Sequence, residues 1–278
     1  MFASRRRRCR AIVAASAVVG DLAAALATSL PKTLTLDIET SPNIADVWGL
    51  FNQNIGISQL RESSRVLCFA AKWHDKRATE FYSEHDDGHA EMIAHAWRLL
   101  DAADILVTFN GPSFDVKHLQ REFLLAGLGP PSPWRNVDLL RVCRAQFKFT
   151  SNKLAHVADR LGLGGKTPHT GHQMWTDVLA GDERAWRLFR KYCVQDVRLT
   201  EKLYDELAGR GWIKDHPHAG LWTGSDRCCP TCGSEELRQD GRWYTTPVTV
   251  YALMTCTKCG THCRMAHVKR RVTTRPAR

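Results

Sequence analysis

Apolar positions in the central part of the chain follow two periods, one typical of strands and one typical of helices. Short apolar runs bounded by turn residues predict strands at 33–39, 65–72, 79–82 and 105–109. Between the last two, apolar residues at helical spacing predict a helix over 90–102 that serves core packing. Strands and helices in this order predict an α/β domain with a mixed central sheet flanked by helices.

Three more helices are expected after the last of these strands. The first covers 115–125 and begins beside a turn that contains Asn110 and Gly111. The second carries apolar residues at helical spacing and has Ser151 as its expected cap. The third is long and runs from about 182 to 208.

Four acidic residues lie where these apolar segments begin or end. Asp37 and Glu39 close the first strand, Asp115 begins a later helix, and Asp196 follows Tyr192 by four positions on the last helix. The spacings place Asp37 with Glu39 on one strand face and Tyr192 with Asp196 on one helix face. Carboxylates at the ends of buried segments destabilise the fold unless a cation binds them. Each pair alone is most often a solvated strand end or an incidental helical pair, so the interpretation depends on their order along the chain.

That order resembles a known family. The chain has a strand with Asp-x-Glu, then a second strand that leads into Asn-Gly and Phe-Asp, and then a late helix with Tyr-x-x-x-Asp. In this order of motifs it resembles the DEDD 3′–5′ exonucleases. These have an RNase H-like fold, and their tyrosine subclass includes the proofreading domain of family-B DNA polymerases. The resemblance covers about 33–216 and includes the stretches 67–73 and 151–154. The other subclass has histidine where this chain has Lys191, so the tyrosine subclass matches better.

The resemblance implies hydrolysis of DNA by two Mg²⁺ or Mn²⁺ ions, with release of nucleoside 5′-monophosphates from a 3′ end. By the same analogy Asp37, Glu39 and Asp196 hold the first ion. Asp37 and, through water, Asp115 hold the second, while Tyr192 orients the attacking water. A ligand set with oxygen atoms alone favours Mg²⁺ or Mn²⁺ over zinc.

Four residues are candidates for substrate binding. Thr40 and Asn110 neighbour the acidic motifs and can touch the terminal nucleotide. Phe114 can stack on a base, although a phenylalanine at a helix start more often belongs to the core. Lys166 can reach a phosphate, but exposure in its glycine-rich loop explains it equally well.

Two Cys-x-x-Cys-Gly motifs mark a second domain. The predicted ligands of one structural Zn²⁺ ion are the thiols of Cys229, Cys232, Cys256 and Cys259. The 23 residues between the motifs fit two antiparallel strands, at 242–246 and 248–253. A zinc ribbon is therefore expected, with metal binding supplying much of its folding energy.

Two neighbouring cysteines leave the ligand choice open. Cys228 could replace Cys229 as a ligand, and Cys263 is expected to be a spare thiol. Disulfides are disfavoured because three other cysteines lie in apolar surroundings typical of a reducing compartment. Aromatic residues interleaved with arginines favour nucleic-acid binding by the ribbon, with docking of replication or repair proteins as the alternative.

Basic charge is concentrated outside the central region. The net charge is +10, of which residues 1–32 contribute +5 and residues 217–278 contribute +6, which leaves −1 for 33–216. Such flanks attract polyanions. The expected organisation is an N-terminal extension at 1–32, an RNase H-like exonuclease domain at 33–216, a zinc ribbon at 217–267 and a basic tail at 268–278.

The first 32 residues imitate a secretory signal, because an arginine cluster precedes an apolar run. Gly20 and Asp21 interrupt that run, which leaves it short of a membrane span. A disordered extension of a cytoplasmic bacterial or phage protein is expected, with a signal peptide at 1–30 as the alternative.

The sequence thus predicts a metal-dependent 3′–5′ exonuclease that acts on single-stranded DNA or DNA 3′ ends, away from membranes. Two alternatives remain open. One is an exoribonuclease that trims RNA 3′ ends. The other is a non-catalytic protein that binds nucleic acid or recruits other proteins to it.

Overall fold

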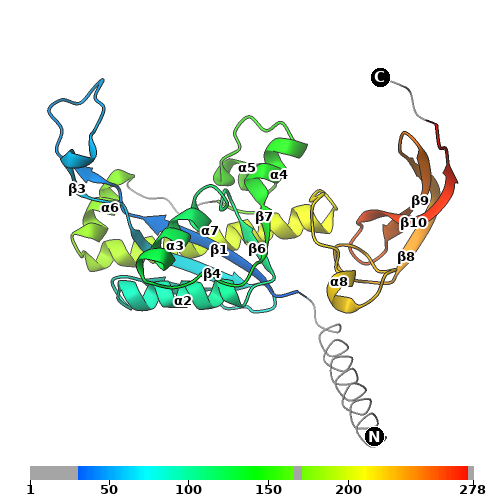
Figure 1. Ribbon diagram of the computed structural model, residues 1–278, viewed down its shortest axis with the longest axis horizontal. Helices are drawn as coiled ribbons and strands as arrows, with labels where there is room; N and C mark the ends of the chain where they lie inside the picture. The colour runs from blue at the N-terminus through cyan, green and yellow to red at the C-terminus, as the bar shows by residue number, and fades with distance from the viewer. Residues whose placement is uncertain (1–30, 166–170, 275–278) are drawn as a thin grey trace, which may run out of the picture. The chain divides into compact units, whose positions relative to one another are not determined.

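The computed structural model describes residues 31–165 and 171–274 (Figure 1). The expectations for the extension at 1–30, for Lys166 and for the last four residues of the basic tail lie outside these ranges. The chain divides into two compact units, a body formed by Lys32–Glu206 and a C-terminal unit that begins at Leu207. Within the described ranges, no helix combines the length and the apolar character that crossing a membrane requires.

The body contains a five-stranded mixed sheet in the order β5-β4-β1-β6-β7 (Figure 1). Strand β1 pairs antiparallel with β4 and parallel with β6, which in turn pairs parallel with β7. The strands are β1 Thr33–Thr40, β4 Val66–Trp73, β5 Glu80–Ser83, β6 Ile105–Thr108 and β7 Arg135–Asp138. The predicted α/β fold with a mixed, helix-flanked central sheet is confirmed.

The side chains of β1 alternate between two cores, as its period of two requires. Leu34, Leu36 and Ile38 pack in the core that α2 (His89–Asp101) and α3 (Asp115–Leu125) cover. The opposite face of the sheet packs against α6 (His172–Leu179) and α7 (Glu183–Gly209). Asp37 and Glu39 therefore point toward the α7 side of the sheet.

Two short helices follow β7 and lie close to its end. They are α4 (Leu139–Gln146) and α5 (Leu154–Arg160). The prediction that Ser151 caps α5 is wrong, because the helix begins after Lys153, which has no side-chain capping bond. Ser151 Oγ instead accepts a hydrogen bond of 3.3 Å from the Lys153 amide within the loop. A small two-stranded sheet, β2 (Ile44–Ala45) with β3 (Leu60–Glu62), and a 3₁₀ turn, η1 (Ile57–Gln59), complete the body.

The C-terminal unit consists of the short helix α8 (Gly220–Thr223) and a three-stranded antiparallel sheet in the order β10-β9-β8. The strands are β8 Leu237–Thr245, β9 Thr249–Cys256 and β10 His262–Arg271. Two of these strands were expected, whereas β10 was not. Among the described side chains of the three strands, only Thr249 and Cys256 are buried. The described side chains of the sheet therefore form no apolar core of their own.

Candidate active site and zinc centre

A cavity of about 720 Å³ opens on the body where β1, β6 and α7 meet. Asp37, Tyr192 and Asp196 line it together with Asn110. The aspartates come from elements almost 160 positions apart in the sequence, so the fold has gathered them. Three of the five predicted catalytic residues thus line one cavity.

Helix α7 is held directly against β1 at this point. The Cys193 thiol lies 3.7 Å from the main-chain oxygen of Asp37. Tyr192 and Asp196 lie one helical turn apart and are 9% and 3% exposed, so both side chains are fixed by packing. Asp37 is half-buried. The cavity therefore has a floor that presents two carboxylates and one phenol.

Asp115 approaches from the other layer of the domain, as the first residue of α3. Its Oδ1 accepts a hydrogen bond of 3.0 Å from the amide of Ile38, the residue between Asp37 and Glu39. Burial raises the pKa of Asp115 to about 7; the Ile38 hydrogen bond opposes this shift and the Asp138 charge adds to it. A buried carboxylate in this position gains most from a nearby cation.

Glu39 lies two residues beyond Asp37 on the same face of β1. The pKa of the Cys68 thiol is raised mainly by burial and further by the negative charges of Glu39 and Asp37. The same two charges also help to raise the pKa of the Cys193 thiol, for which burial is again the main cause. Both carboxylates are therefore near the thiols that line the α7 side of the sheet. The predicted acidic residues are brought to one end of β1 from three elements.

These carboxylates do not close around a single point. Among the described residues, one set of three or more His, Cys, Asp or Glu ligand atoms lies within 4.8 Å of one another, and it consists of four cysteines of the C-terminal unit. The carboxylate donors fit a hard divalent ion, because Mg²⁺ commonly keeps several waters and uses one or two carboxylates with substrate phosphate oxygens. The assignment of Asp37, Glu39, Asp115 and Asp196 as ligands stays a prediction.

The turn after β6 fixes Asn110 at the cavity. Asn110 has a φ of 79°, and its amide donates a hydrogen bond of 2.9 Å to Asp138 Oδ1. The next amide, that of Gly111, donates to Thr108 Oγ1 at 3.2 Å. A Cβ atom on Gly111 would lie 2.2 Å from this oxygen. Only glycine therefore fits the turn as it stands.

We expect Gly111→Ala to lower the free energy of unfolding by about 1–3 kcal/mol, because the added methyl forces the buried Thr108 side chain to move. Urea denaturation followed by circular dichroism measures the change. Gly129→Ala is the matched control, since a Cβ at Gly129 meets no atom within 4 Å. Equal stability of the two variants would contradict the steric argument.

Basic side chains line the same cavity, and the sequence analysis did not predict that role for them, although Lys153 belongs to the family-like stretch 151–154. Arg144 of α4 and Lys153 before α5 belong to its wall. Arg141 lines an adjoining cavity of about 380 Å³ that shares Asn110 and Arg144. The signal for them is tertiary, because α4 and α5 must first be placed beside β6. A floor of carboxylates with a wall of cations suits a phosphodiester substrate.

The remaining substrate-binding candidates differ in their surroundings. The Thr40 carbonyl accepts a hydrogen bond of 3.1 Å from Trp175 Nε1, which fixes the end of β1. Phe114 is 38% exposed and makes an edge-to-face contact with His118 at a ring distance of 4.6 Å, so it is not a core residue. Neither Thr40 nor Phe114 is among the residues that line the two cavities described above.

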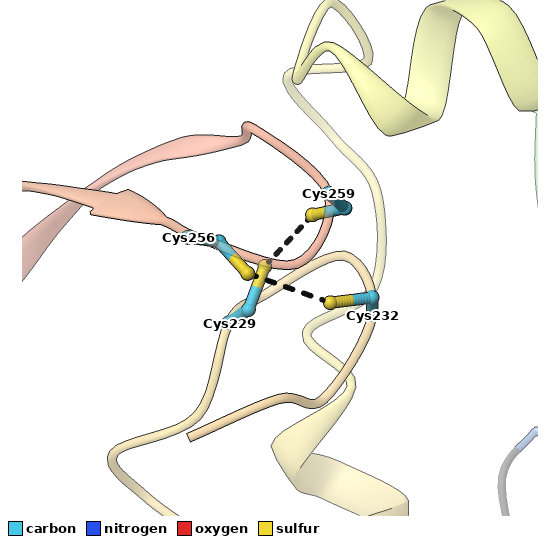
Figure 2. Close-up of side chains that lie close together, drawn as sticks. All are labelled: Cys229, Cys232, Cys256 and Cys259. Atoms are coloured by element: carbon cyan, nitrogen blue, oxygen red, sulfur yellow. Dashed lines mark hydrogen bonds between the residues drawn. The ribbon is translucent and has the colours of Figure 1, made fainter. Parts of the chain in front are cut away.

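The C-terminal unit brings four cysteines together, as Figure 2 shows. The group consists of Cys229, Cys232, Cys256 and Cys259, whose Sγ atoms all lie within 4.8 Å of one another. Opposite Sγ atoms lie 3.6 Å apart for Cys229 with Cys259 and 3.7 Å apart for Cys232 with Cys256. Tetrahedral Zn–S bonds of about 2.3 Å require S···S separations of about 3.8 Å, whereas a disulfide requires about 2 Å. The four thiols can therefore bind zinc.

The surroundings of this group affect the ionisation of its thiols in different ways. Burial raises the pKa of Cys229 and Cys232, which disfavours free thiolates there. Burial acts the same way on Cys259, but its hydrogen bonds with the Thr261 side chain and main chain, and with the Cys232 and Cys229 thiols, outweigh burial and lower the pKa to about 7. Cys228 lies outside the group and directs its thiol to the Ser225 carbonyl at 3.3 Å. Cys263 is also outside the group.

The body's fold occurs in known proteins. No curated protein matches the sequence. Among solved structures, the family B DNA polymerase from the hyperthermophilic archaeon Pyrobaculum calidifontis matches with a TM-score of 0.51 and 18% identity. The match covers 65% of this chain and 25% of the polymerase chain, so this protein spans about a quarter of that polymerase. A family model of the RNase H superfamily matches residues 56–208, more than half of the 278 residues. The chain belongs to the RNase H superfamily.

Proposed function

We propose that this protein is a metal-dependent 3′–5′ exonuclease that removes nucleotides from DNA. The observation that carries the proposal is the convergence of Asp37, Tyr192 and Asp196 in one cavity, with Asp115 attached to the same strand through the Ile38 amide. Superfamily membership supports a nuclease acting on nucleic acid. The DNA substrate and the direction of degradation rest on the motif order and its resemblance to the proofreading exonucleases.

The carboxylates of Asp37, Glu39, Asp115 and Asp196 would hold the divalent ions. When bound, Mg²⁺ or Mn²⁺ would neutralise charge on the scissile phosphate and lower the pKa of the attacking water. The Tyr192 hydroxyl, one turn from Asp196, orients that water by a hydrogen bond. Its oxygen bonds to phosphorus while the bond to the 3′ oxygen breaks. The products are a nucleoside 5′-monophosphate and a strand that ends in a new 3′ hydroxyl.

The residues that line the wall of the cavity would bind and orient the substrate. Arg144 and Lys153 can hold phosphates on the 5′ side of the scissile bond by charge-assisted hydrogen bonds. Asn110, which the turn fixes at the cavity, can contact the sugar of the terminal nucleotide. Thr40 and the exposed ring of Phe114 remain candidates for base or sugar contacts at the end of β1.

The C-terminal unit is proposed to be a zinc ribbon with one structural Zn²⁺ ion. Thiol spacing close to that of a tetrahedral site supports this assignment. We propose that the protein acts on DNA during replication or repair. The superfamily, the ribbon and the basic flanks support this proposal.

The test is an incubation of single-stranded DNA that is labelled in every nucleotide, and of RNA of the same sequence labelled in the same way, with Mg²⁺ or Mn²⁺. We expect DNA to shorten stepwise from its 3′ end and to release mononucleotides, and a blocked 3′ end should prevent this. Preference for RNA would select the 3′-trimming alternative. Internal fragments would refute exonucleolytic action, and tight binding without cleavage would select a non-catalytic role.

A further inference from the structure

The sheet of the C-terminal unit carries an unusual surface for so small a domain. Residues 237–274 contain seven Lys or Arg residues and a single acidic residue, Asp240. Asp240 is already paired with the neighbouring Arg242, whose Nε donates to its carboxylate at 2.7 Å. The basic side chains elsewhere in the sheet therefore have no acidic partner within residues 237–274.

Tyrosines and an arginine share one face of this sheet. Tyr244 of β8 lies directly opposite Tyr251 of β9 in the antiparallel register. The Arg264 guanidinium of β10 lies over both rings, at 4.7 Å from the Tyr251 centroid and 5.5 Å from the Tyr244 centroid. Cation–π contacts of this kind hold a guanidinium in place while its N–H groups stay available for an anion.

A second aromatic–cation pair lies next to the first in the sequence. Trp243 precedes Tyr244, so its ring points to the opposite face of β8. Lys269 Nζ lies 3.7 Å from the centre of the Trp243 ring. Trp243 and Tyr244 are nevertheless 42% and 47% exposed, which leaves part of each ring open to a ligand.

We infer that this sheet binds single-stranded nucleic acid through the face that carries Tyr244, Tyr251 and Arg264. The charge selects a polyanion, and the exposed rings select a polyanion whose bases are not stacked in a duplex. Single-strand-binding proteins combine these two features, because every base has a π face and every nucleotide a phosphate. An acidic protein segment would satisfy the cations but would leave the rings without flat partners.

A simpler role for the rings is to cover a sheet that lacks an apolar core. That role predicts that a large aliphatic residue can replace a ring, since leucine also covers apolar surface. Stacking predicts that only another aromatic residue can do so. The two roles are thus separated by comparing Tyr244→Leu with Tyr244→Phe.

The experiment measures binding of fluorescently labelled oligo-dT by anisotropy, with the full chain carrying Asp37→Asn and Asp196→Asn so that the probe stays intact. This inference does not depend on the nuclease proposal, because binding is read without cleavage. We expect Tyr244→Leu to weaken binding about fivefold or more, the loss of roughly one stacked base. Tyr244→Phe should retain binding, and so should Trp48→Leu, which removes a 98% exposed ring from the body.

A salt titration tests the cationic component. Arg264→Gln should reduce the slope of log K against log salt by about 0.7, the loss of one phosphate contact on a single strand. Arg77→Gln, which removes an exposed arginine of the body, should leave the slope unchanged. Zinc content equal to that of the parent chain shows that each ribbon variant is folded. Unchanged affinity in folded Tyr244→Leu, or equal weakening by Trp48→Leu, would overturn the inference, as would duplex DNA binding more tightly than oligo-dT.

Discussion

Replacement of Asp37 by asparagine is expected to slow nucleotide release by at least about a thousandfold, or about 4 kcal/mol of transition-state stabilisation. Asp37 is the acidic residue that lines the cavity from the sheet, and in the proposed mechanism it would help to hold the divalent ions. Asparagine preserves the shape of the side chain but removes the negative charge that attracts a divalent ion. Quantification of mononucleotides from labelled DNA under single-turnover conditions measures the change.

The stability of the same variant separates a catalytic role from a structural one. The site holds several carboxylates near one end of β1, so loss of one charge relieves repulsion and should leave the melting temperature equal or higher. Asp75→Asn is the matched control, because Asp75 is exposed in the turn after β4. Its activity should equal that of the wild type. An Asp37→Asn protein that is folded and fully active would refute the proposed site.

Strands with a clear apolar pattern were predictable, and strands without one were not. β1 and β4 bury most of their side chains, and their sequences show it. β7 lies at the edge of the sheet and buries only Val137, so nothing in its sequence indicates a strand. β10 is rich in Lys and Arg, and it forms because its main chain pairs with β9. Main-chain pairing between distant segments cannot be recognised from the pattern of residues along the sequence.

The candidate site shows the same division. Motif spacing predicted that Asp37 and Glu39 share one face of a strand and that Tyr192 and Asp196 share one face of a helix, because strand and helix periods fix those relations. It could not predict that Asp115 would be hydrogen-bonded to the Ile38 amide, a contact across 77 positions. Nor could it predict Arg144 as part of the cavity wall, since that depends on where the short helix α4 packs.

Removal of zinc is expected to unfold the C-terminal unit and to leave the body folded. Strand β8 is almost wholly exposed, and β9 buries only the side chains at its two ends, so packing contributes little to hold the ribbon together. Structural zinc sites in small domains contribute about 10–16 kcal/mol, more than such a sheet can supply by burial. Hydrogen exchange read by mass spectrometry, with and without a chelator, should show lost protection in peptides from 229–271 and retained protection in those from β1 and α7.

A pair of cysteine variants makes this test specific to the four-thiol group. Cys232→Ser removes one ligand of the group, and we expect it to release the zinc ion and to reproduce the effect of the chelator. Cys263→Ser makes the same chemical change in the same unit but outside the group, so it should retain one zinc ion per chain. The ribbon cannot depend on the metal if peptides from 229–271 stay protected after zinc has been removed. In that case the close approach of the four thiols must be stabilised by the strand pairing of β9 with β8 and β10 alone.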